Sequence, residues 1–156
     1  MRLYLVRHGR AVTPEENPER PLSKDGRDDI ERMASFLARS KVRPERILHS
    51  GKARAAETAL ILATTLGDSR VVAEMPGISP MDSPRHLVEA ARAWPDDTMV
   101  CGHNPNMERV AATLLTGNDL MPVAAFATGQ IMCLERDDGV EGWTMRWHLR
   151  PSLLRG

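Results

Sequence analysis

The sequence predicts an α/β protein, a three-layer α/β/α sandwich with a mainly parallel central sheet and a C-terminal antiparallel hairpin. Short apolar segments alternate with segments whose apolar residues recur at helical spacing, as in parallel sheets covered on both faces. The last two apolar segments instead flank the turn Asp137–Gly142, which is typical of a hairpin. The length of 156 residues favours one domain, so we expect a single domain over residues 1–156.

Six short β-prone segments predict the strands of this sheet. In chain order they are Arg2–Val6, Arg46–Ser50, Arg70–Ala73, Thr98–Gly102, Gln130–Leu134 and Thr144–His148. The first is nearly all apolar, as a buried strand is, and the third is the weakest of the set. The tail from Pro151 to Gly156 follows the last strand, and we expect it to be loosely held.

Four segments predict the helices, each from a terminal signal and an apolar stripe. Ser23 can cap the first helix, and the second covers Lys52–Leu66. Ser83-Pro84 and Asn104-Pro105 each offer an N-cap followed by proline at the first helical position, so they open the third and fourth helices. Gly117 is a suitable end for the fourth.

Composition excludes several classes of function. Formal net charge is zero, from 21 basic and 21 acidic side chains, so we expect no broad positive surface for nucleic acid or anionic lipid. No apolar run approaches the ~18 residues of a membrane span, and no secretory signal is visible. Cys101 and Cys133 fit small buried hydrophobes in a reducing compartment. We expect a cytoplasmic protein that binds neither nucleic acid nor membrane.

Reactive and cationic residues follow three of the predicted strands. The first strand leads into Arg7-His8-Gly9, and the second ends in Ser50, with Arg54 one turn into the next helix. The fourth leads into Gly102-His103-Asn104. Because the carboxyl ends of parallel strands meet at one edge of a sheet, we expect two histidines and two arginines to converge there.

These residue types suit phosphoryl chemistry. Arginine offers a forked set of donors that matches phosphate oxygens, and the helix start after His103 adds N–H groups and a positive dipole end. A neutral imidazole, with an ordinary pKa of about 6.5, is a competent nucleophile near neutral pH. A cationic pocket around an imidazole therefore predicts phosphoryl transfer through a phosphohistidine.

Several stretches resemble a known family. Leu5–Gly9 is similar to the RHG signature of the histidine phosphatase superfamily, Ser50–Thr58 to its second signature and Gly102–Asn104 to its third. Leu22–Gly26 resembles the loop that opens the family's first helix. The length of the chain and the stretch Arg20–Ser23 look most like the SixA-type phosphohistidine phosphatases.

The resemblance implies roles for individual residues. His8 is then the nucleophile, and the phosphoryl oxygens are held by Arg7, Arg54 and His103. Further substrate contacts are expected from Gly9, Ser50 and Asn104. The resemblance implies neither a metal ion nor another cofactor. We also expect that phosphate or sulfate can occupy the site, and that the partner is a protein bearing phosphohistidine.

The sequence departs from the family pattern at three positions. Arg10 stands where SixA-type proteins carry an acid, and Gly51 stands where they often have proline. Gly77 stands where many members have a glutamate that protonates the leaving group. Glu74 and Asp82 lie nearby and are the remaining candidates for that role.

Alternatives remain open for the substrate and for the arginines. We expect only two sizeable connections, Arg10–Leu22 and Glu74–Ser83, so little chain is left to form a lid. A shallow site favours a phosphorylated side chain on another protein. The alternatives are a phosphatase for a small phosphoester metabolite and a module that binds phosphohistidine or phosphate without turnover. Arg7 and Arg54 could also pair with carboxylates such as Glu57.

Overall fold

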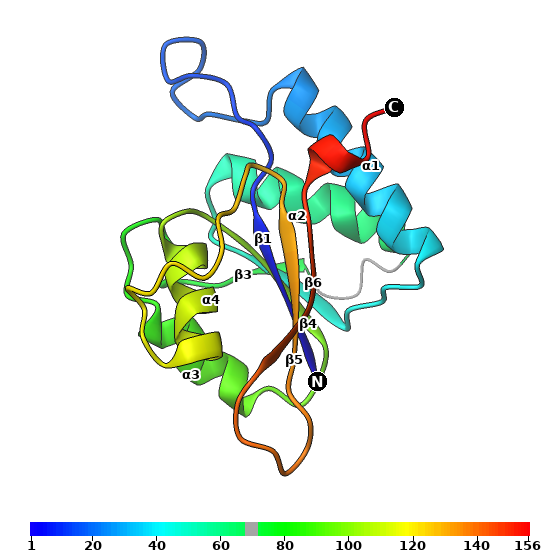
Figure 1. The fold of residues 1–156 in the computed structure, drawn as a ribbon. Helices are drawn as coiled ribbons and strands as arrows, with labels where there is room; N and C mark the ends of the chain where they lie inside the picture. Colours follow the sequence, from blue (N-terminus) through cyan, green and yellow to red (C-terminus); the bar gives the residue numbers. More distant parts are fainter. Residues whose placement is uncertain (68–71) are drawn as a thin grey trace.

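The computed structural model describes residues 1–67 and 72–156 of the chain. Within these residues strands and helices alternate until the C-terminal hairpin, which leads into a short 3-10 turn (Figure 1). In chain order the elements are β1 (Arg2–Arg7), α1 (Lys24–Arg39), β2 (Arg46–His49), α2 (Ala53–Leu66), β3 (Val72–Glu74), α3 (Arg85–Ala93), β4 (Thr98–Gly102), α4 (Asn106–Thr116), β5 (Ile131–Glu135), β6 (Thr144–Leu149) and η1 (Pro151–Leu153).

The strands form one six-stranded sheet in the order β3-β2-β4-β1-β5-β6. Neighbours from β3 to β1 are parallel, whereas β5 is antiparallel to both β1 and β6. The predicted mainly parallel sheet with a C-terminal antiparallel hairpin is therefore confirmed. Since β1 and β4 are adjacent, with Arg7 opposite Gly102, the segments that follow these two strands start side by side.

Helices cover both faces of the sheet, which confirms the predicted three-layer sandwich. α1 and α2 lie on one face, and α3 and α4 lie on the other (Figure 1). The alternation of β1 shows why: Tyr4 and Val6 pack in the α1–α2 layer, whereas Leu3 and Leu5 pack in the α3–α4 layer. All four side chains are buried, each contributing about 1.5–3 kcal/mol to the driving force for folding.

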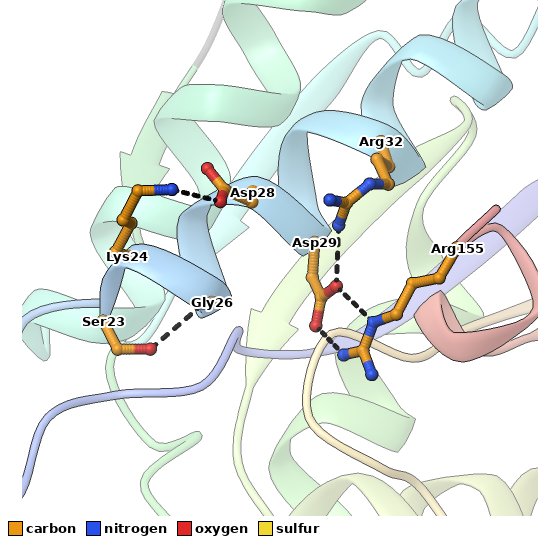
Figure 2. Close-up of polar contacts among 7 residues, drawn as sticks. All are labelled: Ser23, Lys24, Gly26, Asp28, Asp29, Arg32 and Arg155. Carbon is orange, nitrogen blue, oxygen red and sulfur yellow. Dashed lines mark hydrogen bonds and ion pairs between the residues drawn. The ribbon is translucent and has the colours of Figure 1, made fainter.

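Two helix starts follow the predicted capping chemistry. Ser23 is the N-cap of α1, and its hydroxyl accepts the Gly26 N–H at 3.0 Å (Figure 2). α3 begins one residue later than predicted, with Pro84 at the N-cap position, while the Ser83 hydroxyl accepts the Arg85 N–H at 3.2 Å.

The prediction that Asn104 caps the fourth helix is wrong. α4 begins at Asn106, Pro105 occupies the N-cap position, and no side chain caps the helix. The Asn104–Pro105 peptide bond is cis. The Asn104 Nδ2 instead donates to a Glu108 carboxylate oxygen in the first turn of α4 at 2.8 Å, whereas Asn104 Oδ1, the atom that a cap would use, has no hydrogen-bond partner in the described residues. Gly117 ends α4 as predicted, in the left-handed conformation.

The prediction of a loosely held tail is also wrong. Pro151 is buried, and Arg155 forms an ion pair with Asp29 of α1 (Figure 2). Arg155 Nε donates to one Asp29 oxygen at 3.0 Å, and Arg32 donates to the same oxygen at 3.2 Å. Because the Asp29 carboxylate is buried, the arginine of the tail helps to compensate its charge.

Connections differ from the predictions in one respect that matters for the site. A third long connection, residues 118–130, joins α4 to β5, where only two sizeable connections were expected.

Part of the predicted third strand, at Arg70 and Val71, lies outside the described residues. The loop after β1, coloured blue in Figure 1, projects beyond the end of the sheet.

Candidate active site

His8 follows β1 directly and is tied to the end of β4. Its backbone N–H donates to the Gly102 carbonyl at 3.0 Å, and its side chain is largely buried. The ring Nδ1 lies 2.7 Å from the Gly9 carbonyl oxygen. Because a carbonyl oxygen only accepts hydrogen bonds, Nδ1 carries the ring proton and Nε2 keeps its lone pair.

Arg54, the second residue of α2, reaches that lone pair. Its Nε donates to His8 Nε2 across 3.3 Å. Burial, together with the positive charges of Arg54 and Arg7, lowers the pKa of His8 to about 4. The His8 imidazole is therefore neutral near pH 7, with Nε2 facing a cation.

His103 stands beside His8 with ring centroids 4.9 Å apart. Its Nε2 lies 2.6 Å from the Ser50 hydroxyl oxygen. Burial lowers the pKa of His103 to about 3, with the charges of His8 and Arg54 acting in the same direction. Its Nδ1 is buried and has no hydrogen-bond partner in residues 1–67 and 72–156. The structure thus brings together the residues that follow β1, β2 and β4.

Arg7 is oriented by the unpredicted connection, residues 118–130. Its Nη1 donates to the Phe126 carbonyl at 2.7 Å, and Asn104 Nδ2 donates to the same oxygen at 3.0 Å. Glu108 completes the network by accepting the Phe126 N–H at 3.0 Å. Arg7 Nε is buried and unpartnered in the described part of the chain. The sequence gives no signal for the Phe126 contact because any residue has a backbone carbonyl.

The backbone of Gly9 forms hydrogen bonds within the protein, whereas we expected it to contact the substrate. Its N–H donates to Thr58 Oγ1 at 3.0 Å, and its carbonyl accepts from His8, so both polar groups are engaged within the protein. Thr58 is fully buried and donates in turn to the Arg54 carbonyl at 2.7 Å. A Cβ at position 9 would lie 2.8 Å from an Ile30 carbon. These contacts give Gly9 a positioning role rather than a free N–H for the substrate.

The alternative pairing of the arginines with Glu57 is not observed. Glu57 accepts the Leu22 N–H at 2.6 Å and lies 3.7 Å from Arg27. Across the described ranges, no carboxylate forms an ion pair with Arg7 or Arg54. Burial lowers the pKa of both guanidinium groups. The charge of Glu108 acts on Arg7 without an ion pair, and two cations lacking an ion-pair partner beside a neutral imidazole form a site that favours an anion.

Gly77 has no side chain that could donate a proton, and Asp82 takes part in a turn. Gly77 has φ of +83°, and a Cβ there would lie 2.7 Å from the His86 ring, so a side chain at this position is strained and crowded. Asp82 Oδ2 accepts the Ser79 N–H at 2.8 Å within a turn.

Glu74, the last residue of β3, lies against the second motif. A Cβ on Gly51 would come within 2.5 Å of Glu74 Oε1, so glycine lets the carboxylate approach the backbone next to Ser50. Gly51 has φ of +89°, which proline cannot adopt, and this accounts for the missing proline. Of the two candidates Glu74 and Asp82, Glu74 is therefore the one that lies against the backbone next to Ser50.

No group of three or more His, Cys, Asp or Glu side chains in residues 1–67 and 72–156 is placed to hold a metal ion. Among the helices of the same ranges, none is long and apolar enough to cross a membrane.

Fold and site together define a class: α/β enzymes that handle a phosphoryl group with paired histidines and arginines at the carboxyl edge of a parallel sheet. Residues 3–83 match the family described as histidine phosphatase superfamily, branch 1. The chain belongs to this family, and the protein is a phosphatase.

Known relatives agree with the SixA-type resemblance. Over 160 residues the chain is 26% identical to the phosphohistidine phosphatase SixA of Escherichia coli strain K12, covering 99% of this chain and 97% of that protein. The structure of the protein histidine phosphatase SixA complexed with tungstate superposes with a TM-score of 0.88 at 26% identity, over 99% of this chain and 100% of SixA.

The same fold occurs in enzymes with other substrates. A phosphoserine phosphatase from Entamoeba histolytica in complex with 3-phosphoglyceric acid has a TM-score of 0.68 at 16% identity, covering 94% of this chain and 95% of that one. At this level of identity the likeness shows the fold alone, so it does not distinguish among substrates.

Proposed function

We propose that the protein hydrolyses phosphohistidine on other proteins, and that His8 carries the phosphoryl group between the two steps. The contact that supports this role is the 3.3 Å hydrogen bond from Arg54 Nε to His8 Nε2. It supports Nε2 as the unprotonated ring nitrogen, next to a guanidinium of the kind that suits phosphate oxygens.

In the first step, the His8 Nε2 lone pair attacks phosphorus. The new N–P bond forms as the bond between phosphorus and the substrate imidazole breaks, and solvent supplies a proton to the departing imidazole. Charge on the phosphoryl oxygens is stabilised by Arg7 and Arg54. His8 Nδ1 donates its proton to Gly9 O across 2.7 Å. This hydrogen bond stabilises the positive charge that develops on the ring as the N–P bond forms.

His103 acts as a hydrogen-bond donor in this proposal. The Ser50 hydroxyl accepts the Lys52 N–H at 3.4 Å and donates its own proton to His103 Nε2 at 2.6 Å. In the neutral ring Nδ1 then carries the proton, and this buried atom is free to donate to a phosphoryl oxygen. The Asn104 N–H is proposed as a further donor to the same group.

In the second step, water attacks the phosphohistidine. The P–N bond to His8 breaks, inorganic phosphate leaves, and Nε2 regains its lone pair while a water proton passes to solvent. Both steps use the same oxygen contacts, so no rearrangement of the arginines is needed between them.

The choice of phosphohistidine over a phosphoester rests on the leaving group. A protonated imidazole leaves as a neutral amine, whereas an alkyl ester must expel an alkoxide. No acidic side chain stands at Gly77, and a side chain there would meet His86. A small phosphoester metabolite is the alternative, since enzymes of the same fold include a phosphoserine phosphatase.

A substrate panel tests the proposal. Phosphohistidine on a protein, phosphoserine and a set of sugar phosphates are compared by kcat/KM with the intact protein, with His8→Ala as the control for background hydrolysis. We expect phosphohistidine protein to be the best substrate and the variant to be inactive. A metabolite phosphate that is turned over faster would establish the alternative.

A further inference from the structure

The guanidinium of Arg7 is bound by the protein on one side only. Its Nη1 donates to the Phe126 carbonyl at 2.7 Å, whereas Nε is buried without a partner and Nη2 forms no hydrogen bond with residues 1–67 and 72–156. Nε and Nη2 lie on the same edge of a guanidinium, and such an edge can bind two oxygens of one phosphate group in parallel. Because a buried donor without a partner costs free energy, this edge suits an anion that arrives from outside the chain.

The Phe126 peptide group, which leaves that edge of Arg7 unoccupied, is itself held by one carboxylate. Glu108 Oε1 accepts the Phe126 N–H at 3.0 Å, and the same atom accepts Asn104 Nδ2 at 2.8 Å. Asn104 Nδ2 also donates to the Phe126 carbonyl at 3.0 Å. These three hydrogen bonds close a ring around the peptide group. The direction in which the Phe126 carbonyl points therefore depends on Glu108.

This ring of hydrogen bonds lies beside the proposed phosphoryl-binding residues. Asn104 follows His103 directly, and its Nδ2 shares the Phe126 oxygen with Arg7 Nη1. The Arg7 N–H donates to Gln130 O at 3.1 Å, which fixes the backbone of Arg7 but not its side chain. Among the described residues, the Phe126 carbonyl is the one hydrogen-bond acceptor of the guanidinium. The orientation of the guanidinium thus rests on a peptide group that Glu108 holds.

Glu108 can hold this peptide group without neutralising Arg7. Its charge partly offsets the effect of burial, which lowers the pKa of Arg7, but the two side chains form no ion pair in the part of the chain that the structure describes. Glu108 lies in the first turn of α4, where the positive end of the helix dipole stabilises a carboxylate. Arg7 therefore keeps its charge for a ligand.

We propose that Glu108 is a positioning residue for phosphoryl binding: through the Phe126 peptide group it presents the Nε–Nη2 edge of Arg7 to the phosphoryl group. This inference rests on the proposed function, in which Arg7 binds that group. It adds the edge of the guanidinium that binds and the carboxylate that orients it. The competing explanation is a purely structural role, in which Glu108 only ties the connection of residues 118–130 to α4.

A double-mutant cycle on phosphate binding separates these two explanations. Calorimetric titration with inorganic phosphate gives the Kd of the intact protein, of Glu108→Ala, of Arg7→Ala and of the double variant. We expect Glu108→Ala to raise the Kd about tenfold, because a charge-assisted contact is weakened, and to have no further effect once Arg7→Ala is present. Asp119→Ala is the matched control and should leave the Kd unchanged, because Asp119 ties the same connection to α4 by accepting from Arg109 Nε at 3.0 Å.

Glu108→Gln tests the hydrogen bonds apart from the charge. The amide oxygen of glutamine can accept both the Phe126 N–H and Asn104 Nδ2, so this variant should keep most of the phosphate affinity. A second measurement needs no variant at position 108. In heteronuclear NMR spectra of the wild-type protein, phosphate should shift the Arg7 Nε–H resonance, which is assigned by its absence from the spectrum of Arg7→Ala.

Four results would overturn the proposal. They are an unchanged Kd in a folded Glu108→Ala protein, an equal loss with and without Arg7, a loss in Glu108→Gln as large as in Glu108→Ala, and an Arg7 Nε–H resonance that phosphate does not shift. If Arg7→Ala alone leaves the Kd unchanged, the role of Arg7 in the proposed function is wrong and that of Glu108 falls with it. If the cycle shows the coupling but the wild-type protein does not hydrolyse phosphohistidine, the substrate assignment fails and the role of Glu108 stands.

Discussion

Arg54 Nε donates a 3.3 Å hydrogen bond to His8 Nε2. The guanidinium that is proposed to bind the phosphoryl group therefore contacts the proposed nucleophile directly. An arriving phosphoryl oxygen competes for this donor and exposes the Nε2 lone pair. The contact is therefore expected to break as the substrate binds, which links substrate binding to exposure of the nucleophile.

The first prediction concerns the covalent intermediate. Brief exposure to a labelled phosphoryl donor should leave label on the protein that is labile in acid and stable in alkali, as a phosphoramidate is. His8→Ala should bind phosphate but take up no label, because Arg7 and Arg54 remain while the nucleophile is gone. Label retained by this variant would assign the nucleophile to another residue. Rapid quenching and phosphoamino-acid analysis provide the measurement.

The second prediction concerns the acid limb of the pH profile. Because burial lowers the pKa of His8 to about 4, protonation of Nε2 should remove the nucleophile only near that pH. The profile of kcat/KM should therefore be flat from neutral pH down to about 5.5, then fall as the pH approaches about 4. An inflection near 6.5, the ordinary pKa of histidine, would contradict the assignment of a buried neutral imidazole.

The same shift has a consequence for stability. The unfolded chain binds a proton at His8 near pH 6.5, and the folded chain binds it only near pH 4, so stability is complete above about 6.5 and falls as the pH drops toward 4. The contribution of His8 is on the order of 3 kcal/mol. His8→Asn should therefore lose less stability between pH 7 and pH 4 than the wild type, as measured by chemical denaturation.

The third prediction concerns Thr58, which links α2 to the end of β1. Thr58→Val keeps the shape but leaves the buried Gly9 N–H without its acceptor, so we expect a loss of about 1–3 kcal/mol in unfolding free energy. Activity should fall mainly in kcat, since Gly9 and Arg54 are both misplaced relative to the phosphoryl group. Thr64→Val is the control, because that hydroxyl bonds only Leu60 O within the same helix. Equal effects of the two substitutions would refute a positioning role.

The fourth prediction concerns metal ions. Arginines and a histidine already neutralise the phosphoryl oxygens in the proposed site, so a divalent ion is not needed for charge stabilisation. Hydrolysis of p-nitrophenyl phosphate should continue after dialysis against a chelator, and added magnesium or zinc should not increase it. Loss of activity that is restored by one of these ions would point to a different mechanism.

The edge of the sheet where the site lies could be predicted from sequence because parallel strands place their last residues together. Arg7 opposite Gly102 in the sheet register makes His8 and His103 neighbours, and strand order is the only further fact required. Ser23 could be assigned as an N-cap for a similar reason, since the capping bond is local.

The parts that could not be predicted depend on long-range contacts of the backbone. The Phe126 carbonyl orients Arg7 across 119 positions of sequence, and any residue at 126 offers that carbonyl. The sequence predicts Asn104 as a helix cap, but α4 begins two residues later, and the Asn104 side chain is held by bonds from its Nδ2 to Glu108 and to Phe126 O.

The last prediction follows from the missing acid at Gly77. Expulsion of an alkoxide needs a proton donor, and such donors typically contribute ~10²–10⁴-fold. Without one, rates on substituted aryl phosphates should fall steeply as the pKa of the leaving group rises, and glycerol phosphate should be a far poorer substrate than p-nitrophenyl phosphate. Gly77→Glu is a poor test of whether an added acid restores proton donation, because a side chain there meets His86.

The informative variants are Glu74→Gln and Asp82→Asn. If the wild-type slope is steep, neither should change it. Comparable turnover of the alkyl and aryl esters, lost in Glu74→Gln, would instead show that the carboxylate beside Gly51 supplies the proton, and the small-phosphoester alternative would then be favoured.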